Sequence, residues 1–382
     1  MYISLKNRIF GLDVIRALAI LLVLCSHSTL LLFPNQKHIL LTVIQFFGTV
    51  GVDLFFVLSG FLIGTIILKQ VHKGQTKFKD FCYFWVRRWF RTLPNYFLIL
   101  LINIALLFVL KGEVLKGIGV YFAFFQNFNT PHPDFFTEAW SLSIEEYAYI
   151  IGPLLLFVLL LCFKKVSYNR LFILTVLSII LTVTWFRLNF HFNNDIHNMR
   201  EWSQHIRKVV IYRIDSVYYG FLMAFLMYYY NATMMRFKGL LFGVGCLLFL
   251  SIHVLIFSFG VQPENAAFFF NILYLPLLSI SLLMLFPYAI QWNPERFFRT
   301  QITSLSVLSY GLYLVNYSIV LLTLQYAIDM SSCSSIVKLF ILVAYWVVSF
   351  VLAHLLFRYF EYPMTNMRDS KYIKRIFHDK LE

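Results

Sequence analysis

The stretch Gly11–Phe33 reads GLDVIRALAILLVLCSHSTLLLF, and it is apolar and long enough to cross a bilayer as one helix. It nevertheless carries Asp13, Arg16 and His27. Arg16 and His27 are eleven residues apart, roughly 16 Å of helical rise, so their side chains project from nearly the same face. A cation facing lipid costs several kcal/mol, so this face is expected to turn towards protein. Two interpretations stay open: a reaction site or pathway, or an Arg16 that reaches the headgroups and a His27 that hydrogen-bonds a neighbouring helix.

The composition is that of a protein dissolved in lipid. Of the 382 residues, 60% are hydrophobic and 13% are charged, and the mean hydropathy is +0.74. Soluble domains of this size do not have such a composition, which predicts an all-α, polytopic helical membrane protein. The net charge of +14 does not indicate a nucleic-acid partner, because the Lys and Arg residues gather in short loops on one side of the predicted membrane. The five Cys are scattered and form no disulfide or metal pattern.

Apolar windows of about 20 residues predict ten spans. They lie at about 14–33, 44–68, 92–110, 142–163, 170–190, 209–230, 239–259, 268–290, 305–328 and 336–360. About 22 Lys and Arg fall on the side of the N-terminus and about nine on the other, so both termini are expected in the cytosol. One transmembrane domain is expected over 1–366 and a basic cytosolic tail over 367–382, with no room for a soluble domain.

Asp53 introduces a carboxylate into the second predicted span, within GTVGVDLFFVLSGFLIG (48–64). A carboxylate at that depth requires a partner, and Arg16 or His27 of the antiparallel first helix is the expected one. A structural ion pair and a direct role in a reaction both remain open. The glycines around Asp53 indicate close helix contacts.

Arg88 and Arg91 lie in the most basic predicted loop, 69–91, within FCYFWVRRWFRTLPNYF (81–97). Their spacing of three places them on one helical face. Such a pair can hold a phosphate through charge-assisted hydrogen bonds. The alternative, which the spacing alone favours, is anchoring at the cytosolic interface beside Trp85 and Trp89.

Glu145 and Glu146 lie where NTPHPDFFTEAWSLSIEEYAYIIGP (129–153) enters the fourth span. Ser141 followed by early carboxylates is typical of a helix start, but two adjacent Glu exceed what a cap requires. One of them is therefore expected to face protein, as a general base or as the proton partner of a histidine.

Later spans contain further polar residues. Arg213 and Asp215, in YRIDSVYYG (212–220), are two apart, so they diverge on a helix and are expected to have different partners. Asn316 lies in the middle of the ninth span. Pro363 is expected to prevent the last helix from continuing.

Taken together and in this order, these segments resemble the acyltransferase 3 family of bacterial integral-membrane acyltransferases. The matching pieces are GLDVIRALA with His27 eleven residues after Arg16, GVDLFFVLSGFLIG, RRWFRTLP, WSLSIEEYAYIIGPLL, YRIDSVYYG, SYGLYLVNYS and FEYP. The resemblance implies a protein of the bacterial cytoplasmic (inner) membrane that moves an acyl group, commonly acetyl from cytosolic acetyl-CoA, to a sugar hydroxyl. Expected acceptors are lipopolysaccharide O-antigen, exopolysaccharide or related envelope glycans and glycolipids.

The resemblance also implies roles for single residues, with His27 performing the chemistry. The implied residues are His27, Arg16, Glu145 and Asp53 for catalysis, and Arg88 and Arg91 for the acyl-CoA. Arg213, Asp215 and Asn316 are further candidates, for binding the substrate. Acyl-CoA is expected as a donor substrate, without a permanently bound cofactor or a metal. Neutral imidazole is the natural base for deprotonating the attacking hydroxyl. An acyl-His27 intermediate and direct transfer both stay open.

Two departures from the family pattern affect these expectations. Many relatives have a His where this chain has Asn316, which cannot titrate near neutrality. Some relatives carry a soluble SGNH-type domain, which is not expected here, so that either the membrane domain acylates its acceptor directly or a separate periplasmic partner completes the transfer. A homo-oligomer is a further option. The competing class is a proton-coupled transporter or flippase, which predicts inverted repeats that the sequence does not show.

Overall fold

The computed structural model describes residues 8–34, 36, 38–112, 116–292, 298–368, 370, 376 and 377. Within these ranges the chain is helical and contains no strand. Ten helices there are long and apolar enough to cross a membrane, which confirms the predicted fold class and number of spans. Most of the predicted tail 367–382, and Lys6 of the N-terminal segment, lie outside the described residues.

Six of the ten spans are continuous α-helices. They are α1 (Phe10–Leu32), α2 (Ile39–His72), α3 (Phe78–Lys111), α5 (Ala139–Cys162), α6 (Tyr168–Asn193) and α11 (Lys238–Ser258). The other four are built from successive segments: α8 (Val210–Arg213) and α9 (Asp215–Tyr229); the π-helix η3 (Phe269–Tyr274), α12 (Leu275–Leu283) and α13 (Phe286–Gln291); α14 (Arg299–Val315), the π-helix η4 (Asn316–Leu321) and α15 (Leu322–Ala327); and α16 (Ser335–Leu356), the π-helix η5 (Phe357–Glu361) and α17 (Tyr362–Arg368). The connections contain α4 (Gly119–Phe122), η1 (Phe125–Asn127), α7 (Met199–Trp202), η2 (Ser203–Arg207) and α10 (Asn231–Arg236).

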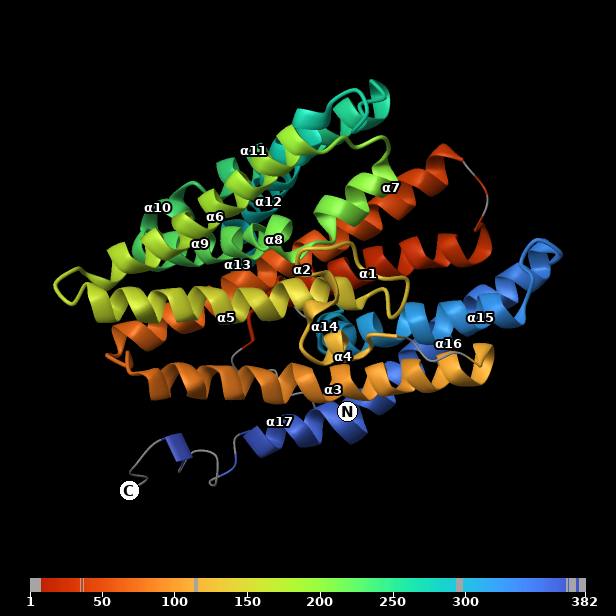
Figure 1. The fold of residues 1–382 in the computed structure, drawn as a ribbon, viewed down its shortest axis with the longest axis horizontal. Coiled ribbons are helices and arrows are strands. Elements are labelled where there is room, and N and C mark those ends of the chain that lie inside the picture. The colour runs from red at the N-terminus through yellow and green to blue at the C-terminus, as the bar shows by residue number, and fades with distance from the viewer. Residues whose placement is uncertain are drawn as a thin grey trace.

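The long helices run side by side, with α1 and α2 near the middle of the bundle (Figure 1). The most apolar windows of α2 and of the α8–α9 span are 72% buried, whereas those of α11 and of the α16–α17 span are 22% buried. α2 and α9 therefore form the protein core, and α11 and α16 present most of their surface to lipid.

Glycines set the distance between α2 and α9. A Cβ added to Gly60 would lie 1.9 Å from the Val217 carbonyl oxygen, and one added to Gly220 would lie 2.2 Å from the Val57 carbonyl oxygen. The two backbones are thus in direct contact, as small residues permit in membrane helices. The close helix contacts predicted from the glycines of 48–64 are confirmed at this crossing.

Three predicted boundaries are wrong. The loop 69–91 is reduced to a turn between α2 and α3, because α3 begins at Phe78, where the Asp80 carboxylate accepts a hydrogen bond from Lys77 N–H at 2.9 Å. Arg88 and Arg91 consequently lie on a helix. Hydropathy windows miss this extension because they measure apolarity and not helicity.

The other two errors concern α5 and the last span. α5 begins at Ala139, so Ser141 lies inside the helix and does not cap it. The last span continues beyond Pro363 to Arg368. Pro363 lies in the first turn of α17, directly after the π-turn η5, where a missing backbone N–H is tolerated.

Candidate active site

A cavity of about 570 Å³ lies between α2, α3, α5 and α14. It extends along α3 from Tyr83 to Tyr96, which corresponds to about 20 Å of helical rise. Positive charge dominates its lining, in which seven Lys and Arg side chains face two Glu side chains. These residues are Arg16, Lys69, Lys73, Arg87, Arg88, Arg91, Arg368, Glu145 and Glu146.

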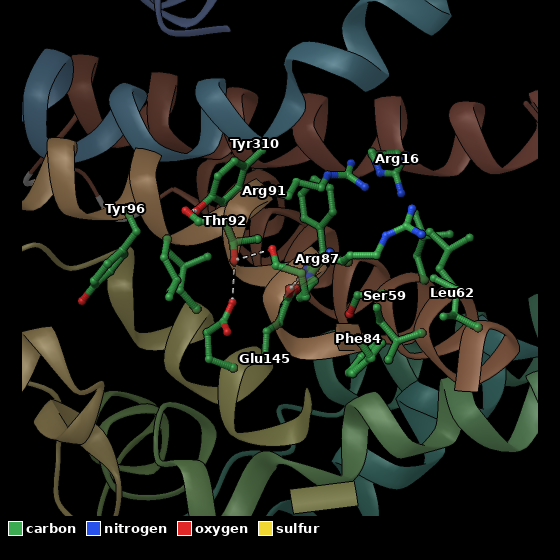
Figure 2. Close-up of a pocket in the computed structure, with 18 of the residues that line it drawn as sticks. Arg16, Ser59, Leu62, Phe84, Arg87, Arg91, Thr92, Tyr96, Glu145 and Tyr310 are labelled. Carbon is green, nitrogen blue, oxygen red and sulfur yellow. Dashed lines mark hydrogen bonds and ion pairs between the residues drawn. The ribbon is translucent and has the colours of Figure 1, made fainter. Parts of the chain in front are cut away.

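Three arginines from two helices direct their guanidinium groups towards the same part of this cavity. They are Arg16 of α1 and Arg87 and Arg91 of α3 (Figure 2). The Arg16 guanidinium lies 3.4 Å from Ser306 Oγ and 3.9 Å from Asp13 Oδ1. Arg16 and Arg91 are close enough to repel one another electrostatically, so the arrangement favours an anion between the arginines.

Arg88 is fixed by partners on α5. Its Nη2 donates to the Tyr149 hydroxyl at 2.9 Å and lies 3.5 Å from Glu145 Oε2, while the guanidinium stacks on the Tyr149 ring at 4.4 Å. Tyr149 in turn donates to Glu145 Oε2 at 2.6 Å. Arg88 and Arg91 both line the cavity, so the predicted shared face is confirmed.

Glu145 and Glu146 both face protein, whereas the prediction required this of only one of them. Glu146 is 5% exposed and accepts a hydrogen bond from Thr92 Oγ1 at 3.0 Å. Glu145 takes the Arg88 and Tyr149 contacts. The pair therefore attaches α5 to α3 along the cavity wall.

His27 lies outside the residues that line this cavity and forms a separate cluster with η4. Its Nδ1 is hydrogen-bonded to Asn316 Oδ1. The Asn316 amide is oriented by its Nδ2, which donates to the carbonyl oxygens of Leu312 at 2.6 Å and Tyr313 at 3.0 Å. Since Oδ1 can only accept, His27 Nδ1 must carry the proton and Nε2 the free lone pair. The structure thus holds His27 in the tautomer that a general base requires at Nε2.

Tyr313 links the cavity to this histidine cluster, because its side chain lines the cavity and its backbone carbonyl accepts from Asn316 Nδ2. The hydroxyl groups of Tyr313 and Ser141, which both line the cavity, are 2.6 Å apart, and Tyr313 also donates to the Glu138 carbonyl at 3.3 Å. Beyond them, the Glu138 carboxylate accepts from Ser318 Oγ at 2.5 Å. Glu138 is not among the predicted site residues. Its signal was an acidic residue directly before a span, in the same segment as Glu145.

The predicted partner of Asp53 is wrong. Asp53 forms an ion pair with Arg213 of α8, not with Arg16 or His27. Both side chains are buried, and neither lines the cavity. α1 and α2 do pack together, but Asp53 faces the other side of α2, where α8 approaches it.

Asp215 pairs with Arg187 of α6, with 2.6 Å between Oδ2 and Nη2. Arg213 and Asp215 therefore have different partners, as predicted from their spacing. Both are fully buried away from the cavity, whereas Asn316 contacts His27. Over the described ranges, no group of three His, Cys, Asp or Glu side chains has the geometry to hold a metal ion.

This arrangement provides two chemical environments. The cavity suits a polyanionic ligand, because arginine and lysine bind phosphate through charge-assisted hydrogen bonds. The histidine cluster supplies a base of fixed tautomer.

Comparison with known proteins adds a family and two relatives. The peptidoglycan O-acetyltransferase OatA of Listeria monocytogenes is 31% identical over 194 residues, which cover 46% of this chain and 28% of that protein. The Bacillus subtilis protein named "Putative peptidoglycan O-acetyltransferase YrhL" is 35% identical over 165 residues, which cover 39% of this chain and 24% of that protein. The matched stretch thus spans about a quarter of the length of these relatives.

No solved structure is significantly similar to the chain. A family model described as an acyltransferase domain matches residues 9–358, nearly the whole chain. The match includes the helices that carry the cavity and the His27 cluster. The chain therefore belongs to the acyltransferase 3 family of multi-pass membrane acyltransferases.

Proposed function

We propose that this chain transfers an acetyl group from cytosolic acetyl-CoA to a hydroxyl of an envelope glycan. The observation that carries the proposal is the cavity of about 570 Å³, with its surplus of Lys and Arg. The names of the two relatives favour a peptidoglycan acceptor over lipopolysaccharide O-antigen or exopolysaccharide. The positive-inside distribution of Lys and Arg supports a cytosolic position for the basic end of the cavity in a bacterial inner membrane.

Donor binding uses the length and charge of the cavity. The phosphates of acetyl-CoA bind near Arg16 and Arg91, where guanidinium forks match phosphate oxygens. Arg88, which Tyr149 and Glu145 hold in place, adds positive charge to the same cavity. The thioester arm then extends along α3 towards Tyr96 and Ser141. This end of the cavity is connected to the His27 cluster through Tyr313. The Tyr313 hydroxyl contacts Ser141, and the Tyr313 carbonyl accepts a hydrogen bond from Asn316.

The transfer step uses His27 Nε2 as the base. Nε2 takes the proton of the acceptor hydroxyl as its oxygen attacks the acetyl carbonyl, so that a C–O bond forms and the C–S bond breaks. The proton passes from Nε2 to the departing CoA thiolate. The Tyr313–Ser141 hydrogen bond lies at this end of the cavity, and we expect this contact to open when the acetyl group approaches His27.

The donor assignment is tested with the paired substitution Arg88→Gln and Arg91→Gln. Each charge-assisted hydrogen bond contributes about 1.5–3 kcal/mol, so the KM for acetyl-CoA is expected to rise at least about 10-fold in membranes that contain the full chain. Arg170→Gln, at an exposed arginine at the start of α6, is the matched control and should leave KM unchanged. Equal KM values for all three proteins would place the donor elsewhere.

The acceptor assignment is tested by mass spectrometry of envelope glycans from cells with and without the gene. Acetyl groups are expected on the peptidoglycan only when the chain is present, and His27→Ala should abolish them. Glycans of the same mass in all three strains would exclude acetyl transfer to a glycan. A transporter would move its substrate without releasing CoA from acetyl-CoA.

A further inference from the structure

Glu138 occupies the cap position of α5 but does not cap the helix. A carboxylate directly before a helix usually accepts a hydrogen bond from the backbone N–H of the second or third helical residue. Glu138 has φ −63° and ψ −17°, and its side chain forms no such bond. It is directed instead to the neighbouring span, where Oε1 accepts from Ser318 Oγ at 2.5 Å and from Ser318 N–H at 3.3 Å.

The Glu138 carboxylate is buried without a cation. Its side chain is 4% exposed, and its second oxygen, Oε2, has no hydrogen-bond partner. Asp53, Asp215 and Glu145 each have an arginine partner, but no described residue forms an ion pair with Glu138. A buried anion without a counter-charge is costly, so a purely structural role would be served better by a neutral side chain.

Glu138 also determines the local geometry around His27. Ser318 and Asn316 lie two residues apart in the π-helical turn η4, and π-turns of this kind occur frequently at functional sites. By accepting both Ser318 bonds, Glu138 fixes the turn whose Asn316 amide accepts the His27 hydrogen bond. Removing the carboxylate would therefore loosen the group that sets the His27 tautomer.

We propose that Glu138 is a positioning residue for His27: it fixes Asn316 through Ser318, and its negative charge offsets the positive charge that His27 acquires during transfer. This inference rests on the proposed function. The proton of the acceptor hydroxyl moves to His27 Nε2 and then to the CoA thiolate, and none moves to Glu138. The carboxylate acts only in its ionised form, in the way that a carboxylate stabilises an imidazolium in hydrolase triads.

The inference predicts a pH dependence. Glu138 precedes the membrane-spanning part of α5, and burial raises its pKa to about 7, while the Ser318 hydrogen bonds oppose that rise. Because the ionised form is the active one, the rate should rise as the pH passes through about 7. The ionisable groups around this cluster are Tyr313, Tyr317, Tyr345, Asp134 and Arg207.

The experiment compares wild type, Glu138→Gln and Ser318→Ala as full-length chains in membrane vesicles. Deuterium-labelled acetyl-CoA is the donor, and glycan strands that contain N-acetylmuramic acid are the acceptor. The kcat and KM are measured from about pH 5.5 to about pH 8.5, a range of about three units that includes the pKa of Glu138. Glu138→Gln keeps an acceptor for Ser318 but cannot ionise. It should lower kcat about 10- to 100-fold, as for groups that orient a histidine. It should also leave the KM for acetyl-CoA unchanged and remove the rise near pH 7.

Ser318→Ala is the second variant, and it keeps the test decisive if Glu138→Gln does not fold. It removes a hydrogen bond that lowers the pKa of Glu138, so the rise in rate should move to higher pH. A purely structural role for Glu138 would change stability without moving the profile. An unchanged profile in the folded variants, with an active wild type, would overturn the role of Glu138 alone. A wild type that transfers no label at any pH would overturn the proposed function and this inference with it.

Discussion

At the scale of single residues, Asn316 is the hydrogen-bond partner of His27. It cannot exchange a proton, but its Oδ1 accepts from His27 and, at 3.3 Å, from the Tyr345 hydroxyl. Asn316 therefore contributes orientation and not acid–base chemistry. Of the two side chains in this contact, only His27 can act as a base.

Asn316→Leu is expected to lower kcat about 10- to 100-fold, because an unrestrained His27 imidazole populates both tautomers and several ring orientations. Tyr345→Phe is the matched control, since it removes the second hydrogen bond to Asn316 and leaves the bond to His27. Its kcat should stay within about 3-fold of wild type. The kcat of both variants is measured with saturating acetyl-CoA. Equal rates for Asn316→Leu and wild type would show that the tautomer is set by another group.

At the scale of helices, the crossing of α2 and α9 depends on the absence of side chains at Gly60 and Gly220. α2 carries residues of the cavity wall as well as Asp53, the partner of Arg213. A displacement of α2 would therefore change both the cavity and the Asp53–Arg213 contact.

Gly60→Ala places a methyl group 1.9 Å from the Val217 carbonyl oxygen, a backbone atom that can move only with α9. Forced overpacking of this kind costs about 1–3 kcal/mol, so a lower midpoint of thermal unfolding in detergent is expected. Gly239→Ala in α11 is the control, because no atom lies within 4 Å of its added Cβ. A midpoint equal to that of the control would show that the two helices separate without cost.

At the scale of the whole molecule, the uneven distribution of Lys and Arg is expected to fix the orientation in the membrane. The turn that contains Lys165 should face the cytosol, and the turn that contains Ser332 should face the opposite side. Both residues are exposed, so each can be replaced by cysteine in a chain whose five native cysteines have been removed.

A membrane-impermeant maleimide should label Ser332→Cys in intact spheroplasts and Lys165→Cys only after the membrane is permeabilised. The reason is that the side with more Lys and Arg stays in the cytosol during insertion. Labelling is measured by the mass shift of the purified chain. The reverse pattern would place the basic end of the cavity outside the cell and exclude a cytosolic donor.

The sequence by itself determined the features that depend on local periodicity. Hydropathy over about 20 residues fixes the ten spans, because lipid requires each span to satisfy its own backbone. Helical spacing predicted that Arg88 and Arg91 share one face and that Arg213 and Asp215 have different partners. The structure confirms both predictions. The match to an acyltransferase family followed from motifs that the printed sequence already contains.

Only the tertiary structure decided which distant residues meet. Asp53 pairs with Arg213, 160 positions away, and His27 bonds to Asn316, 289 positions away. Glu138 reaches across to η4, and this contact has no trace in the local pattern of its own segment. Spacing along a helix fixes the direction of a side chain relative to its own axis. Its partner depends on how neighbouring helices pack, and here close contacts such as Gly60 against Val217 set that packing.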